Sequence, residues 1–167
     1  MKKIYTFIFL IVTYVIVLLV PANNSISNMN VLTIQKYQEY ITLGNVFTDY
    51  IVLNTEGNYI NAIDVHIKYN PQFLELTDYQ YTQSFCQYYI EKNVDYQNGI
   101  INLTCGVPSP GFYGKNNILI LKFKPLAYGD TSINVLKTSE IMLNSPKPIN
   151  MLNYFTKQKI SVIISSE

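Results

Sequence analysis

The amino-acid sequence predicts a single all-β domain, a sandwich or a barrel, and three observations lead to that expectation. From residue 31 onward, short segments of alternating apolar and polar residues are separated at regular intervals by Gly, Asn, Pro and Asp. Tyr is abundant, at 15 residues, while Trp is absent, a composition that favours half-buried strands over helices. The 167 residues suffice for one domain with one hydrophobic core.

The N-terminal segment has the pattern of an export signal. Lys2 and Lys3 precede an apolar run over residues 4–20, and Pro21-Ala22 ends that run. A run of this length is also at the lower limit for crossing a bilayer, so an uncleaved helical anchor is the alternative to a cleaved signal peptide. Both alternatives predict that the rest of the chain is exported, either secreted or held at the cell surface.

The chain is therefore expected to have three parts. Residues 1–22 are the signal peptide or membrane anchor, residues 23–30 a short linker, and residues 31–167 the β domain. Contact with a membrane is expected only through the first part, if it stays uncleaved.

The domain is expected to contain about nine strands. The clearest is residues 60–69, where apolar residues at every second position alternate with Asp64, His66 and Lys68, so that one side is core and the other wet. Asn98-Gly99 is a strong hairpin signal and predicts that residues 85–95 pair with residues 101–105. The expected strands are 31–37, 47–53, 60–69, 73–76, 85–95, 101–105, 118–124, 131–136 and 159–165, with a further short strand at 141–143.

Cys86 and Cys105 fall on the two strands of the expected hairpin. Outside the cell they can pair as a disulfide, and the alternative is two unrelated buried thiols. A bridge that closes a loop of some twenty residues contributes about 3 kcal/mol through loop closure. Two cysteines and the single histidine, His66, do not form a zinc-ligand spacing, so no metal site is expected.

Charge and motif content argue against several classes of function. The formal net charge is +1 and no basic run is present, which speaks against nucleic-acid binding. No nucleophile elbow, phosphate-binding glycine loop or calcium-binding loop occurs, and the acidic residues are scattered. We therefore expect a binding protein with no catalytic residues and no cofactor.

Several short motifs, in one order along the chain, resemble those of a known family. Tyr69-Asn70-Pro71-Gln72-Phe73-Leu74-Glu75-Leu76 is the most specific of them. The others are Gly44-Asn45-Val46-Phe47-Thr48, Ile60-Asn61-Ala62-Ile63, Gly99-Ile100-Ile101-Asn102-Leu103, the loop from Gly106 to Phe112, Ile120-Leu121-Lys122-Phe123-Lys124 and Gly129-Asp130-Thr131. Taken together, from Thr42 to Leu143, they resemble the cohesin domains, which bind dockerin modules.

The resemblance implies a jelly-roll sandwich that binds a dockerin-type partner through the outer side of one sheet, formed by the third, fifth, sixth and eighth strands. Carried onto this sequence, the partner-binding face comprises Asp64, His66, Lys68, Tyr89, Glu91, Asn102 and Thr104. An ordinary solvated face is the alternative for these residues. For His66, a plain surface histidine is the alternative to a pH switch or a ligand.

Two positions depart from the family pattern. Asn70 stands where Asp is usual, and Asp49 stands where an inward apolar residue is usual. Because a buried carboxylate without a partner costs several kcal/mol, either the strand shifts locally or Asp49 finds a donor.

Two other functions remain open for the same fold. Polysaccharide binding needs a planar strip of aromatic rings, for which Tyr79, Tyr81, Tyr88, Tyr89 and Tyr96 are the candidates. A structural or assembly protein of the cell surface, with exposed strands that contact a larger complex, is the third possibility.

Overall fold

The computed structural model of the protein describes residues 32–35, 40–82, 85–147, 149–152 and 156–163. These residues form eleven strands and no helix. The strands are β1 (Leu32–Gln35), β2 (Tyr40–Thr42), β3 (Phe47–Asn54), β4 (Ile60–Lys68), β5 (Leu74–Tyr81), β6 (Tyr88–Asp95), β7 (Ile100–Gly106), β8 (Lys115–Pro125), β9 (Gly129–Val135), β10 (Glu140–Leu143) and β11 (Lys157–Ile163).

The expected signal or anchor, residues 1–22, and the expected linker, residues 23–30, lie outside the described residues. Within the described part of the chain, no helix is long and apolar enough to cross a membrane.

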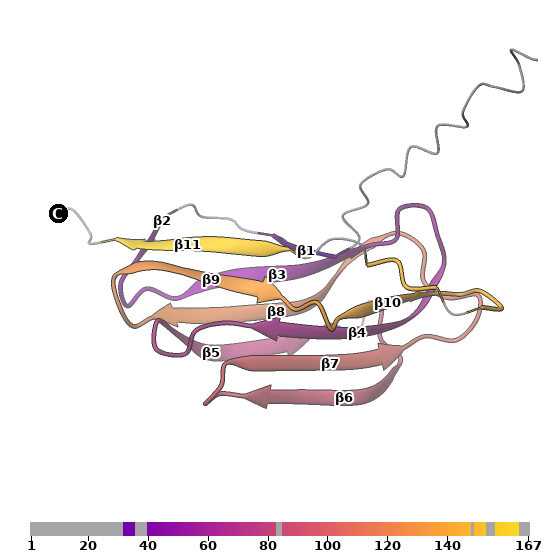
Figure 1. The fold of residues 1–167 in the computed structure, drawn as a ribbon, viewed down its shortest axis with the longest axis horizontal. Coiled ribbons are helices and arrows are strands. Elements are labelled where there is room, and N and C mark those ends of the chain that lie inside the picture. The colour runs from indigo at the N-terminus through magenta and orange to yellow at the C-terminus, as the bar shows by residue number, and fades with distance from the viewer. Residues whose placement is uncertain (1–31, 36–39, 83–84, 148, 153–155, 164–167) are drawn as a thin grey trace, which may run out of the picture.

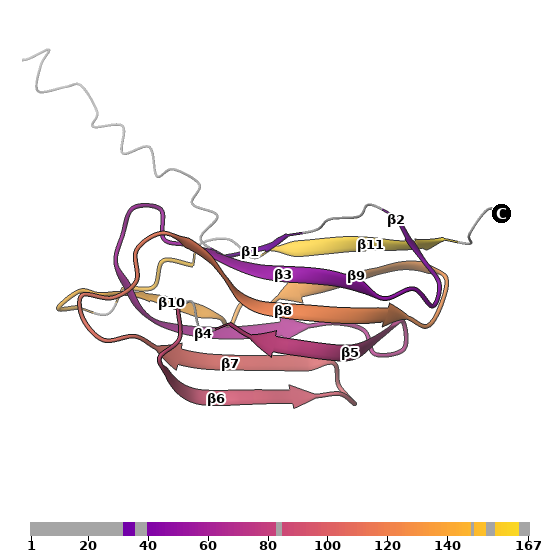
Figure 2. The ribbon, with the colours of Figure 1, turned by 180° about the vertical axis from the view of Figure 1, so that it is seen from behind.

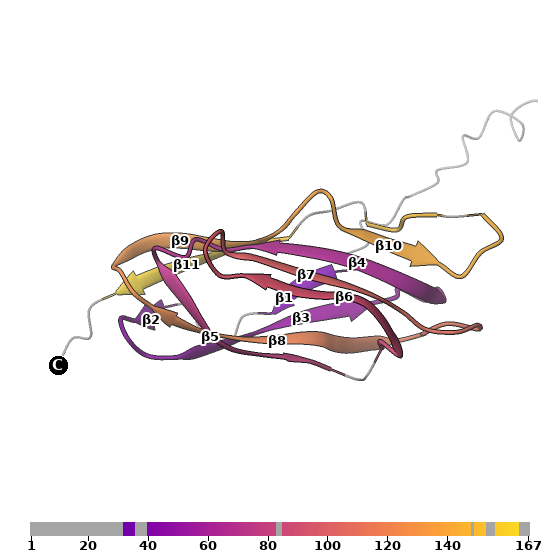
Figure 3. The same cartoon turned by 90° about the horizontal axis from the view of Figure 1, so that it is seen from below.

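The strands form two sheets that pack face to face (Figure 1 and Figure 2). The smaller sheet has the order β1-β3-β8-β5, and the larger has the order β2-β11-β9-β4-β7-β6, with β10 beside β4. In Figure 3, turned by 90°, β4 and β9 lie in one layer while β3 and β8 lie in the other. This two-layer arrangement is the all-β sandwich that the alternating sequence predicts.

Most expected strands are present close to their predicted bounds, and the short strand at 141–143 is present as β10. The predicted hairpin is confirmed, because Asp95 pairs with Ile100 and Val94 with Ile101 across the Asn98-Gly99 turn. The count is eleven because the short strand β10 adds one to the expected nine and β2, which was not expected, adds another. β5 is also longer than expected, since it continues to Tyr81 past an irregularity between Leu76 and Asp78.

The core fills the space between the sheets with side chains from alternate positions of each strand. Phe123 of β8 lies near its centre and is fully buried. Its ring contacts Phe47 at 5.8 Å and Tyr69 at 5.1 Å between centroids. Burial of an apolar side chain of this size contributes about 1.5–3 kcal/mol, so such residues hold the two sheets together and keep their outer sides stiff.

Asp49 is the inward carboxylate that the sequence marks as awkward. β3 keeps its register there, with Asp49 opposite the buried Leu121 of β8, and the side chain is 1% exposed. The amide Nε2 of Gln158, on β11 in the other sheet, donates a hydrogen bond to Asp49 Oδ1 at 3.1 Å. Of the two expected solutions, the chain therefore uses a donor and not a local shift of the strand.

Gln158→Leu is expected to destabilise the fold by about 2–3 kcal/mol, because it removes a donor from a buried carboxylate. Denaturant unfolding followed by tyrosine fluorescence measures this change. The double variant Asp49→Leu with Gln158→Leu is the matched control, and it should recover most of the loss. Equal loss in the single and double variants would contradict a stabilising hydrogen bond between the sheets.

Cys86 and Cys105 form a disulfide, with a sequence separation of 19 residues. Both residues are buried in the core. Cys105 belongs to β7 and Cys86 lies just before β6, so the bridge closes the end of the hairpin opposite its turn. It fixes the segment that leads into the edge strand of the larger sheet.

Candidate partner-binding face

The outer side of the larger sheet brings most of the predicted site residues together. Asp64 of β4 is in register with Thr104 of β7, which in turn is in register with Glu91 of β6. In the next row, His66 of β4 is in register with Asn102 of β7. Because strand residues alternate between the two sides of a sheet, all five point away from the core.

These five residues form two hydrogen-bonded sets, Asp64 with His66 and Thr104, and Glu91 with Asn102, which together we call the polar plateau. The Thr104 hydroxyl donates to Asp64 Oδ1 at 2.7 Å, and Asp64 Oδ1 also lies 3.1 Å from His66 Nε2. Asn102 Nδ2 donates to Glu91 Oε1 at 3.1 Å. The plateau is half-buried and its side chains are held in place before any partner arrives.

His66 is anchored on both sides of its ring. Nε2 faces Asp64, and Nδ1 lies 2.7 Å from the Thr138 hydroxyl oxygen in the turn before β10. The His66 backbone N–H also donates to Ser139 Oγ at 2.9 Å. His66 is therefore a fixed part of the face and not a freely rotating surface side chain.

Lys68 lies at the end of the same strand, where its ammonium group donates to the Asn98 carbonyl oxygen in the β6–β7 turn. Asn98 also donates from its backbone N–H and its side-chain amide to the Asp95 carboxylate, which lowers the pKa of Asp95. Gly99 has φ +62°, and a Cβ there would lie 2.4 Å from the Tyr69 carbonyl oxygen, so only glycine fits. The turn thus holds Lys68 beside the plateau.

Tyr89 does not belong to the outer side, and its expected place there is wrong. A register shift between Tyr89 and Glu91 leaves Ile90 as an extra residue, so Tyr89 is opposite the buried Cys105 while Glu91 is opposite Thr104. Strict alternation over β6 put Tyr89 and Glu91 on one side, and the bulge reverses that relation. Ile90 itself is 81% exposed.

The inner position of Tyr89 places it in the seam between β5 and β6. Its ring packs against Tyr81 at 6.2 Å with 64° between the planes, and Tyr81 packs against Tyr79 at 77°. Lys92 Nζ covers the Tyr89 ring at 3.4 Å from its centroid. Three of the tyrosines that sequence analysis offered for sugar stacking therefore form an edge-to-face cluster and not a planar strip.

Burial raises the pKa of Tyr81 to about 12, and its buried hydroxyl has no hydrogen-bond partner among the described residues. Because the unfolded chain ionises this phenol near pH 10, stability should fall between about pH 10 and about pH 12. Tyr81→Phe should reduce that fall and leave stability at pH 7 equal or higher by up to about 1 kcal/mol. Thermal unfolding of the variant and the unaltered chain, at pH 7 and between about pH 10 and about pH 12, tests this. A loss of stability of the variant at pH 7 would show that the Tyr81 hydroxyl does form a hydrogen bond.

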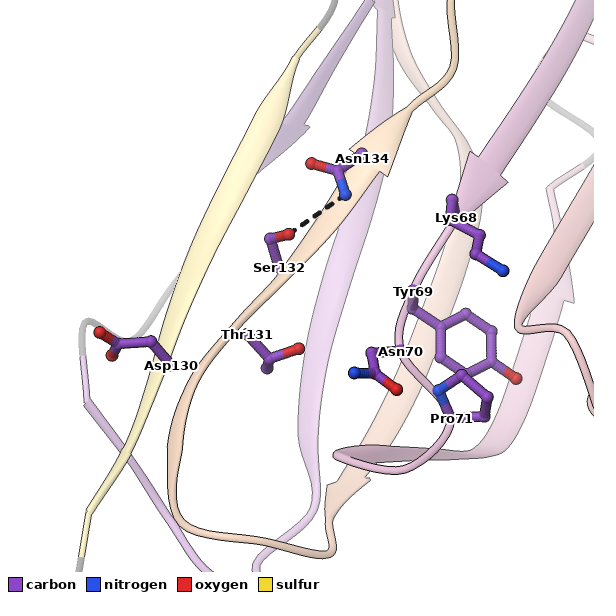
Figure 4. Close-up of a pocket in the computed structure, with 8 residues that line it drawn as sticks. All are labelled: Lys68, Tyr69, Asn70, Pro71, Asp130, Thr131, Ser132 and Asn134. Carbon is purple, nitrogen blue, oxygen red and sulfur yellow. Dashed lines mark hydrogen bonds between the residues drawn. The ribbon is translucent and has the colours of Figure 1, made fainter.

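β9 adds a groove to the face that the sequence analysis missed. The groove, about 400 Å³, separates the end of β4 and the Asn70-Pro71 turn from β9 (Figure 4). A second hollow of about 290 Å³ continues it toward β11. The side chains that line the two hollows are mostly lysines, hydroxyls and amides, including Lys68, Asn70, Thr131, Ser132, Asn134, Lys157, Lys159 and Ser161, with the carboxylate of Asp130.

The geometry can be compared with that of solved structures. The chain superimposes on the seventh ScaB type I cohesin from Pseudobacteroides cellulosolvens with a TM-score of 0.67, at 18% identity, over 81% of this chain and 93% of that one. It also superimposes on a type II cohesin domain from the cellulosome of Acetivibrio cellulolyticus, with a TM-score of 0.60 and 16% identity, over 78% and 93% of the two chains. The chain has the cohesin fold.

A cohesin module from a family 33 glycoside hydrolase of Clostridium perfringens gives a similar match, with a TM-score of 0.61 and 9% identity, over 82% of this chain and all of the other. No protein-family model matches the sequence, and no curated protein is significantly similar to it. The structural matches confirm, at the level of the fold, the resemblance that the motifs indicate.

The cohesin fold also clarifies which strands share the face. With the short strands β2 and β10 left out of the count, the third, fifth, sixth and eighth strands are β4, β6, β7 and β9. These four are neighbours in the order β9-β4-β7-β6. The strands that the family resemblance implies thus form one continuous surface in this cohesin fold.

Proposed function

We propose that this protein is a non-catalytic binding module that holds a dockerin-type partner on the outer side of β9, β4, β7 and β6. The observation that carries the proposal is the polar plateau, whose two hydrogen-bonded sets of side chains lie at the middle of that surface on a cohesin fold. Solved structures with this fold include cohesins in complex with dockerins, from Acetivibrio cellulolyticus and Clostridium thermocellum.

A surface of this kind suits protein recognition for a physical reason. Its backbone is fixed by the sheet and its central side chains are fixed by one another, so little conformational entropy is lost when a partner binds. The half-buried plateau offers hydrogen-bonding groups at defined positions, which favours specificity.

The proposed location is outside the cell, either secreted or at the surface. The support for it is the sequence pattern of residues 1–22, which precedes the described part of the chain. A dockerin partner would then be encountered outside the membrane.

The test is retention by two classes of probe in parallel. The immobilised full chain is challenged with a panel of dockerin modules and with insoluble polysaccharides under the same conditions. We expect retention of at least one dockerin and no retention by polysaccharide. Retention by polysaccharide alone would replace dockerin binding with the carbohydrate-binding alternative.

A further inference from the structure

Three carboxylates lie in one row across the large sheet, from the first residue of β10 to the middle of β6. Glu140 of β10 is in register with Asp64 of β4, and Thr104 of β7 separates Asp64 from Glu91 of β6. Among the described residues, the only basic side chain within ion-pair distance of these three carboxylates is His66, whose Nε2 lies 3.1 Å from Asp64 Oδ1. We call Glu140, Asp64 and Glu91 the acid row.

Three lysines lie on the same outer side, where β4, β9 and β11 are neighbours. Lys68 of β4 is in register with Asn134 of β9, which is in register with Lys157 of β11, and Lys159 is in register with Ser132 of β9. Lys157 and Lys159 are exposed, and within the described part of the chain neither forms an ion pair. We call the two adjoining hollows that Lys68, Lys157 and Lys159 line the lysine groove.

Two carboxylates lie near the lysine groove, where the three lysines outnumber them. Asp130 accepts a hydrogen bond from the Ser161 hydroxyl at 2.7 Å, and Asp95 is held by Asn98 in the β6–β7 turn. The hydroxyls and amides of the groove add donors for an incoming anion. The groove is therefore suited to carboxylates, while the acid row is suited to ammonium or guanidinium groups.

The acid row and the lysine groove are far enough apart to act separately. Asp64 and Lys68 are four residues apart on β4, about 13 Å at the usual strand rise. This distance exceeds the screening length of about 8 Å at physiological ionic strength. A charged group of a partner therefore interacts chiefly with whichever of the two it covers, the acid row or the lysine groove.

From this arrangement we infer that the face is electrically polarised along its strands and that it selects a dockerin-type partner of matching polarity. Such a partner carries basic side chains where it covers the acid row and carboxylates where it covers the lysine groove. The inference rests on the proposed function, and it adds the charge pattern of the partner and the direction in which the partner lies on the sheet.

Charge reversal at each end tests the polarity. Lys157→Glu with Lys159→Glu alters the groove, and Glu91→Lys with Glu140→Lys alters the acid row. Affinity is measured by calorimetry for the full chain and a dockerin retained in the parallel assay. Each pair should weaken binding about tenfold or more at low salt, with a smaller effect at high salt.

Lys115→Glu with Lys124→Glu, two exposed lysines of β8 in the other sheet, is the matched control and should leave affinity within about twofold. If the dockerin binds but either reversal at the face leaves affinity unchanged, the polarity is wrong while the proposed function stands. If the unaltered chain binds no dockerin, the proposed function fails and the inferred charge pattern fails with it.

Discussion

Lys68→Glu combined with Thr104→Arg is expected to abolish dockerin binding while the melting temperature stays nearly unchanged. Thr104 lies between Asp64 and Glu91, so an arginine there would pair with both carboxylates and cover the plateau. Lys68→Glu places a negative charge at the edge of the lysine groove. Loss of contacts at the centre of an interface costs at least about 3 kcal/mol, or more than a hundredfold in affinity.

The matched control places the same two changes on the outer side of the smaller sheet. Thr77→Arg with Lys124→Glu alters an exposed threonine of β5 and an exposed lysine of β8. This variant should bind the dockerin like the unaltered chain. Calorimetry gives the affinities, and a thermal scan checks that both variants are folded. Undiminished binding by the Lys68→Glu, Thr104→Arg variant would show that the partner binds elsewhere.

Removal of the disulfide is expected to give the largest loss of stability. Cys86→Ala with Cys105→Ala frees a loop with a sequence separation of 19 residues in the unfolded chain. Loop-closure entropy predicts a loss of about 3 kcal/mol, equivalent to a drop in melting temperature of roughly 10 °C. Alanine avoids placing a hydroxyl at two buried positions.

Two measurements separate the bridge from the side-chain volume. Chemical reduction of the unaltered chain should lower the melting temperature by nearly as much as the double substitution does. Intact mass should rise by about two daltons on reduction, as expected when one disulfide opens. No mass change, together with no effect of reductant on melting, would mean that the two cysteines are not bridged in the protein as made.

The fold was accessible from the sequence wherever strands keep a regular period. In β4, buried residues such as Val65 alternate with Asp64 and His66 from Ile63 to the end of the strand, and the Asn98-Gly99 turn fixes the partner of β6. The match to the motifs between Thr42 and Leu143 then pointed to one sandwich fold in particular. The buried Asp49 was also foreseen as a position that needs a donor, although Gln158 was not.

The site was less accessible because a bulge breaks the rule on which it was predicted. Ile90 is an ordinary strand residue by composition, and nothing in the sequence marks it as the extra residue that turns Tyr89 inward. The lysine groove was missed for a different reason. Lys157 and Ser132 are distant in sequence and meet only because β9 and β11 pair in the folded sheet.

The central claim is that the partner lies on the outer side of β9, β4, β7 and β6, and an NMR titration tests it most directly. A dockerin retained in the parallel assay is added to the isotope-labelled full chain, and the backbone amide signals are followed. The account predicts that the largest shifts occur at the polar plateau, beside Asp64, Asn102 and Thr104, and extend along β9 toward Ser132. Shifts confined to the β1-β3-β8-β5 sheet, or to the seam between β5 and β6, would contradict it.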